Sequence, residues 1–136
     1  MLKRFSLLIP LVLILVLTVG CTGTPNVKLD TEFALSIGQS ARINSESMVI
    51  KFIDVTEDSR CPKDVQCIWA GRVSCDIEIT RDGISNRIIL TQPAQTTGSG
   101  NTFENYLFDV KVSPYPETGK EITKKDYRLS LIVTKK

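Results

Sequence analysis

Apolar and polar residues alternate with a period of two along most of the chain after residue 32. Such alternation indicates strands with one buried and one solvated face. The clearest case surrounds Asp82-Gly83, because Asp-Gly between alternating runs favours the positive φ angles of a tight hairpin turn. No window shows the 3.6-residue apolar stripe of a helix. The expected strands lie within 33–37, 41–43, 48–55, 73–79, 84–90, 106–112 and 127–133.

About seven short strands separated by turn signals predict an all-β fold, a single antiparallel β-sandwich or small barrel. Residues 48–55 are apolar on both faces except at Lys51 and Asp54, which predicts a central or bulged strand. Loops on a rigid β scaffold are where recognition is usually carried. The three candidate loops are 57–71, 91–103 and 113–121.

The first 20 residues have the features of an export signal. Lys3 and Arg4 precede an apolar run from Leu7 to Val19, which is of signal-peptide length and short for a membrane-spanning helix. A cleaved signal peptide and a retained anchor both place the following domain outside the cytoplasm.

The segment Thr18-Val19-Gly20-Cys21 resembles the lipobox of prokaryotic lipoproteins, in which the cysteine thiol receives a diacylglycerol and becomes the new N-terminus. Thr18 departs from this pattern, because the lipobox usually has Leu there. The expected organisation is a signal peptide at 1–20, lipidated Cys21 with a tether at 21–31, and a β domain at 32–136. The lipid would hold the domain on the extracytoplasmic side of a cell-envelope membrane.

Export changes the charge of the domain. Removing Lys3 and Arg4 reduces the 17 basic residues to 15, against 15 acidic ones. A neutral domain gives no electrostatic basis for binding nucleic acid. The expected partners are therefore the membrane, through the lipid, and an unknown protein or glycan.

The segment 57–73, EDSRCPKDVQCIWAGRV, holds Cys61, Cys67 and the single tryptophan, Trp69. Outside the cytoplasm, two cysteines separated by five residues favour a disulfide over a metal site. Closing so small a ring contributes roughly 2 kcal/mol. Cys75 follows the inward alternation of its strand and is expected to be a buried free thiol. A Cys67–Cys75 pairing is the alternative.

Metal binding and catalysis lack the usual side chains. The chain has no histidine, so a zinc site on the three cysteines would need Asp58 or Asp64 as its fourth ligand. The usual general base and nucleophile pairs are also missing, which leaves only paired carboxylates for an enzyme. We therefore expect no metal, no cofactor and no catalytic activity.

The motif Asp58-Ser59-Arg60-Cys61-Pro62, followed by Cys67 and Trp69-Ala70-Gly71, resembles a signature of small exported prokaryotic lipoproteins of uncharacterised function. The resemblance extends to the opening of the domain near residues 33–39 and to its closing strand near 127–133. The family implies no activity. Its members have two cysteines in this segment, so Cys75 is a departure that fits a core position.

Five residues of this segment form a candidate interaction loop: Asp58, Arg60, Lys63, Asp64 and Trp69. Three of them also have a structural interpretation. Trp69 is expected to pack against the disulfide and cover the core. Asp58 and Arg60 are expected to bind each other or loop backbone. Gly71 is expected to supply backbone freedom where the loop re-enters a strand.

These features favour a lipid-anchored, non-catalytic binding or envelope-interaction module. One alternative is a structural or protective surface lipoprotein without a specific ligand. Another is an inhibitor that presents the Cys61–Cys67 loop to an extracellular protease, because a small constrained ring can be preorganised for binding.

Overall fold

A computed structural model describes residues 23–93 and 100–136 of the chain. The expected signal peptide and Cys21 lie outside the described residues, as does the middle of the 91–103 loop. Within the described ranges, no helix has the length and apolar character needed to cross a membrane.

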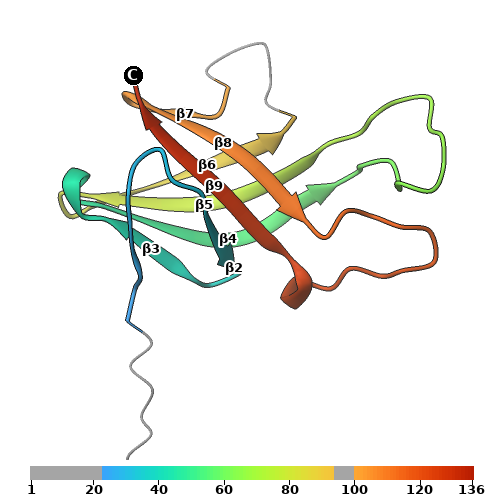
Figure 1. Ribbon diagram of the computed structural model, residues 1–136, viewed down its shortest axis with the longest axis horizontal. Helices are drawn as coiled ribbons and strands as arrows, with labels where there is room; N and C mark the ends of the chain where they lie inside the picture. Colours follow the sequence, from blue (N-terminus) through green and yellow to red (C-terminus); the bar gives the residue numbers. More distant parts are fainter. Residues whose placement is uncertain (1–22, 94–99) are drawn as a thin grey trace, which may run out of the picture.

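Two sheets pack face to face as a β-sandwich, which confirms the predicted fold class (Figure 1). The first sheet has the order β1 (Asn26–Val27), β3 (Ser40–Ile43), β4 (Met48–Asp58), β5 (Val73–Arg81) and β6 (Ile84–Gln92). The second has the order β2 (Phe33–Ser36), β9 (Arg128–Lys135), β8 (Tyr106–Ser113) and β7 (Thr102–Phe103). Two single-turn 3₁₀ helices lie at η1 (Asn44–Glu46) and η2 (Lys124–Asp126).

Hydrogen-bonded neighbours within the sheets are antiparallel except β1 and β3, which run parallel. The turn residues Asp82 and Gly83 have φ angles of 49° and 80°, as expected for a tight hairpin turn. Register shifts after Phe52 and after Val55 confirm the bulged character expected of β4.

The core lies between the sheets and consists of the inward residues of each alternating run. On β8 the burial alternates strictly, with Tyr106 buried and Leu107 exposed at its start. Burying one face of each sheet is the main stabilising contribution expected of such a fold. The largest fully buried side chains include Phe52, Leu35, Ile50, Ile77, Ile79, Leu90, Leu129 and Leu131.

The stretch 21–31 is not a free tether throughout. Asn26 and Val27 form β1 on the edge of the first sheet, and Pro25 accepts a 2.9 Å hydrogen bond from the Arg42 amide. Val27 and Leu29 pack against the core. Two apolar residues are too few to show a period, so Gly23 and Pro25 dominate the sequence pattern there.

Two side-chain amides join the sheets where β6 meets β8. The Thr91 N–H donates to Asn101 Oδ1 at 2.8 Å, and Asn101 Nδ2 donates to the Thr91 carbonyl at 2.8 Å. The backbone carbonyl of Asn101 accepts a hydrogen bond from the Phe108 backbone N–H at 2.8 Å. One residue further along, Gln92 Oε1 accepts from the Val112 amide at 2.9 Å. These bonds close one seam of the sandwich.

Candidate interaction site on a disulfide-closed loop

Residues 59–72, called here the disulfide loop, connect β4 to β5. Backbone hydrogen bonds extend the β4–β5 ladder into its base, from Ser59 to Arg72 at 2.8 Å and from Cys61 to Ala70 at 3.2 Å. Gly71 has a φ of 69°, and a Cβ there would lie 1.8 Å from the Ser59 carbonyl oxygen. Only glycine fits this position, which confirms its expected role.

Cys61 and Cys67 form the predicted disulfide, with their Cα atoms 5.9 Å apart. Cys75 is free and buried in the core, as expected. Burial raises the pKa of its thiol to about 12. The Cys75 thiol is therefore protonated at neutral pH and packs as a small apolar group.

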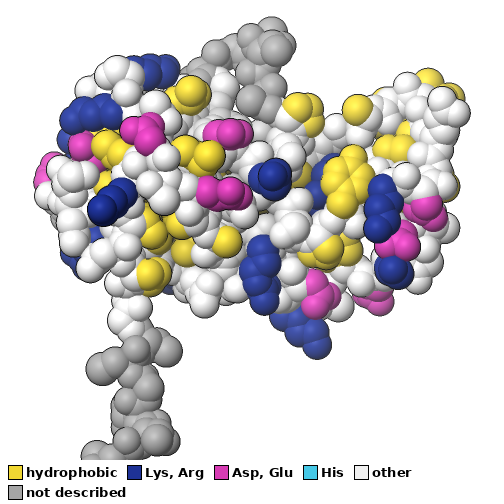
Figure 2. All heavy atoms as spheres, viewed as in Figure 1, with side chains coloured by type: hydrophobic (Ala, Val, Ile, Leu, Met, Phe, Trp, Pro, Cys, Tyr) yellow, Lys and Arg dark blue, Asp and Glu magenta, His cyan; other side chains and the backbone are white. Residues whose placement is uncertain are grey.

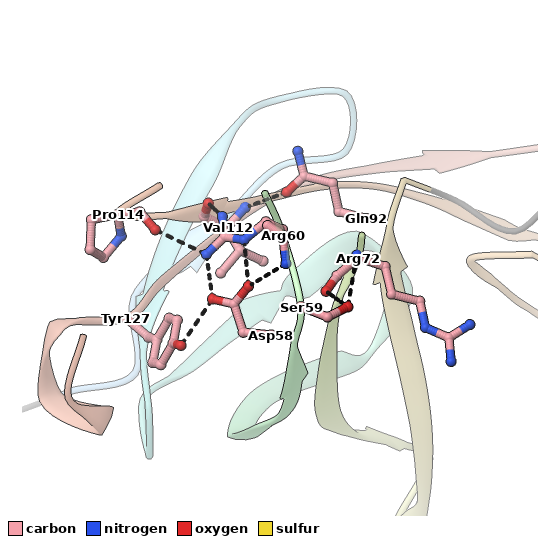
Figure 3. Close-up of polar contacts among 8 residues, drawn as sticks. All are labelled: Asp58, Ser59, Arg60, Arg72, Gln92, Val112, Pro114 and Tyr127. Carbon is pink, nitrogen blue, oxygen red and sulfur yellow. Dashed lines mark hydrogen bonds and ion pairs between the residues drawn. The ribbon is translucent and has the colours of Figure 1, made fainter. Parts of the chain in front are cut away.

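Asp58 and Arg60 form a buried ion pair beneath the disulfide loop (Figure 3). Arg60 is only 7% exposed and donates to both Asp58 carboxylate oxygens, at 2.8 Å from Nε and 2.7 Å from Nη2. Its guanidinium also donates to the carbonyls of Val112 at 2.8 Å and Pro114 at 3.0 Å. The Tyr127 hydroxyl donates to Asp58 Oδ2 at 3.0 Å. The arginine thus joins the end of β4 to the end of β8.

The electrostatics of this cluster favour one protonation state. Burial by itself would raise the pKa of Asp58, but hydrogen bonds and charge from Arg60 bring it below the ordinary value. Burial and the hydrogen bond to Asp58 raise the pKa of Tyr127 to about 12. At pH 7 the Asp58 carboxylate is therefore ionised and the Tyr127 phenol is neutral. This arrangement fits a structural role for the cluster. Asp58 and Arg60 bind each other and loop backbone, as their structural interpretation expects.

Lys63 and Asp64 hold the disulfide loop against residues 114–127, called here the companion loop. The Lys63 amide donates to the Pro116 carbonyl at 3.0 Å, and its Nζ lies 3.0 Å from Glu117. The Thr118 amide donates to Asp64 Oδ1 at 2.9 Å, and this bond lowers the pKa of Asp64. Both residues therefore hold the two loops together.

Trp69 does not cover the core. It is 69% exposed, and its neighbours Ile68 and Val65 are 97% and 48% exposed. The disulfide loop and the companion loop project beyond the sheets at the right-hand end of Figure 1, and Trp69 belongs to the first of these loops. The buried side chain of this loop is instead that of Arg60, which bonds to the Val112 carbonyl of β8. Val65, Ile68 and Trp69 are called here the apolar tip.

Figure 2 shows hydrophobic side chains on this protruding end, among side chains of both charges. Tyr115 on the companion loop is also half-exposed, and its ring lies 5.0 Å from the Arg60 guanidinium carbon. Beneath Tyr115 is a hollow of about 310 Å³, lined in part by Lys63, Glu117 and Ile122. The protruding end therefore combines apolar contact area with a polar, charged rim.

Of the predicted interaction residues, Trp69 alone belongs to the apolar tip. Ile68 and Val65 were not expected there. Their signal is an apolar pair, Ile68-Trp69, placed just after a cysteine in a segment that has no strand alternation. A ring of this size cannot bury such residues by itself.

Within residues 23–93 and 100–136, no cluster of three or more His, Cys, Asp or Glu side chains is arranged to hold a metal ion. The disulfide loop offers an apolar contact surface at Val65, Ile68 and Trp69. No protein-family model, curated protein or solved structure matches this chain.

Proposed function

We propose that the protein is a lipid-anchored, exported, non-catalytic binding module that contacts a protein partner outside the cytoplasm through the apolar tip. The observation that carries this proposal is the exposure of Trp69, Ile68 and Val65 on a loop fixed at several points. Grouped exposed apolar side chains on a soluble domain mark interaction sites. Tryptophan is also among the residues most enriched at the energetic centres of interfaces.

The loop is preorganised for binding. Its base is fixed by the Cys61–Cys67 bridge, by the close approach of Gly71 to Ser59, and by the bonds of Arg60. Asp64 fixes it to the companion loop. A rigid loop loses little conformational entropy when a partner docks, so more of the contact energy appears as affinity. Disulfide and ion pair thus support recognition without taking part in it.

The position of the loop supports a protein partner over the membrane that holds the anchor. In Figure 1 the described chain begins at the left of the molecule, whereas the disulfide loop lies at the right-hand end. With a lipid on Cys21, only four residues precede β1. This short tether keeps the left of the domain close to the bilayer and leaves the apolar tip away from it.

The protease-inhibitor alternative is less well supported. The Val65 amide donates to the Pro62 carbonyl at 3.2 Å, and the Lys63 amide donates to Pro116. An inhibitory loop that pairs with a protease as an extended strand needs those backbone groups free. A purely protective protein gives no reason for an exposed tryptophan on a rigid loop.

The test is partner capture by the full-length protein in its membrane. A photo-crosslinking residue is placed at Gln66, and partners are identified by mass spectrometry. The double variant Ile68→Ser with Trp69→Ala is expected to lose at least tenfold of the specific crosslink, because the anchor side chains are gone. Leu107→Ser, which removes an exposed apolar side chain on β8, is the matched control. Unchanged capture by the double variant contradicts the proposal, and a glycan as the captured species contradicts the assigned partner class.

A further inference from the structure

Strand β6 forms the edge of the five-stranded sheet and pairs with β5 on one side only. The β5–β6 hairpin has a two-residue turn, so Arg81 and Ile84 form a pair that exchanges both backbone hydrogen bonds. Hydrogen-bonded and non-hydrogen-bonded residue pairs then alternate along the β5–β6 ladder. Ser85, Arg87 and Ile89 consequently direct their N–H and C=O groups away from β5, toward the open side.

The bonds at Thr91 support this assignment independently. Thr91 is the next residue in the outward series, and both of its outward groups are taken by the Asn101 side-chain amide at 2.8 Å. Asn101 supplies there the donor and the acceptor that a neighbouring strand would supply. Among the described residues, nothing pairs in this way with Ser85, Arg87 or Ile89.

The open part of β6 lacks the usual protection of an edge strand. Residues 84–89 contain no proline and no lysine, and the β5–β6 register has no bulge. Arg87, their one charged residue, is ion-paired with Asp76 of β5. Ile84 and Ile89 are 67% and 51% exposed. A straight, apolar and electrically neutral edge favours pairing with another strand.

We propose that β6 pairs antiparallel with β6 of a second copy of this chain, about a two-fold axis at Asn86. A second copy offers a strand that is already extended and exposed in the matching pattern, so its pairing needs no further ordering. An axis at Arg87 would place two arginines directly opposite each other, which is unfavourable. With the axis at Asn86, Arg87 of each copy lies opposite Ser85 of the other, and Thr91 with its Asn101 cap stays outside the paired stretch.

This register gives two residue pairs that exchange hydrogen bonds, Ser85 with Arg87 and Arg87 with Ser85. The two Asn86 side chains meet at the axis in the closer, non-hydrogen-bonded type of pair. The Asn101 cap on Thr91 limits the pairing to the open stretch. Such an interface is small, so the dimer is a dynamic one that depends on high local concentration. It is independent of the apolar tip.

Cysteine cross-linking of the full-length protein in its membrane tests the register. Asn86→Cys is expected to form a disulfide-linked dimer on mild oxidation, because opposite Cα atoms in such a pair lie about 4.5 Å apart. Ile88→Cys is the control on the same strand and face. In this register its two copies lie roughly 14 Å apart and cannot be bridged. The native Cys75 is buried and does not compete.

Added substitutions test the backbone pairing. Arg87→Pro removes only an outward N–H and leaves the β5–β6 ladder intact, so it is expected to lower the Asn86→Cys dimer at least tenfold. Arg87→Ala removes the same side chain and keeps the N–H, so the dimer is expected to stay within twofold. Thermal unfolding verifies that both variants are folded. Equal cross-linking at residues 86 and 88, no cross-linking at 86, or equal yields from the proline and alanine variants would overturn the proposal.

Discussion

Arg60 connects three parts of the molecule through one planar group. Its guanidinium satisfies the Asp58 carboxylate and the carbonyls of Val112 and Pro114, which come from different segments of the chain. A lysine ammonium could not reproduce this planar set of donors. The arginine is therefore a structural residue, although a charged side chain in a loop first suggests recognition.

Arg60→Met is expected to lower the free energy of unfolding by about 3 kcal/mol, because Asp58 then stays partly buried without its counter-charge. Urea unfolding of the full-length protein at pH 7 measures the effect. Arg72→Met is the control, since its ion pair with Glu57 is exposed and is expected to contribute less than about 1 kcal/mol. Equal losses in the two variants would contradict the structural role of Arg60.

The Asp58 cluster also predicts a dependence of stability on pH. Because the folded-state pKa of Asp58 is lowered below 3.8, its ionisation stabilises the fold above that pH. The contribution is lost as the pH falls through the folded-state pKa. Comparing wild type with Asp58→Asn isolates this group. The difference in unfolding free energy is expected to be largest near neutral pH and to shrink below about pH 4, and a constant difference would argue against it.

At the scale of the element, the disulfide loop is an extension of the β4–β5 hairpin whose stiffness comes from covalent closure and from contact with the companion loop. Trp69 is the single tryptophan of the chain and reports directly on it. Its exposure means that the fluorescence signal changes with the loop and not with the core.

The double variant Cys61→Ser with Cys67→Ser is expected to leave the sandwich folded and to cost about 2 kcal/mol, because only a short ring is opened. Trp69 emission should be that of an exposed indole in both proteins. Its fluorescence anisotropy should fall in the variant, as the tip gains freedom. Blue-shifted emission from the native protein would show that Trp69 is buried.

The base of the loop yields a separate prediction. Gly71→Ala is expected to destabilise the protein by several kcal/mol, since the new Cβ would overlap the Ser59 carbonyl and the φ is also positive. Gly119→Ala has a similar φ of 76° with open space around its Cβ, and should cost about 1 kcal/mol. Thermal and urea unfolding of both variants separates the overlap from the backbone conformation, and similar costs would exclude the close approach at Gly71.

At the scale of the whole molecule, alternation predicted the long strands because burying one face of a sheet imposes a period of two on each of them. The Asp82-Gly83 turn and the Cys61–Cys67 bridge were also predictable, since both depend on local sequence. Strands β1 and β7 were not, because two residues carry no period.

The exposure of Trp69 was predicted wrongly. Trp69 lies in the loop between two long strands, and its local sequence does not indicate how far that loop projects beyond the sheets. The long-range bonds of Arg60 and Asn101 were equally out of reach, because each joins residues whose proximity is set by the order of strands in the sheets. Sequence patterns therefore gave the inward faces, while the candidate site depends on topology.

The amide of Asn101 has a consequence for how this architecture can vary. At Thr91 this amide makes the hydrogen bonds that one residue of a strand between β6 and β8 would make. The two sheets are therefore already joined by hydrogen bonds at this point. Strand β7, which follows Asn101, is only two residues long, so the connection between the sheets extends no further along β6. A longer segment in its place could continue along β6 and join the two sheets along the whole of this seam. The length of this one segment thus decides whether the chain completes itself or leaves an edge for a neighbour.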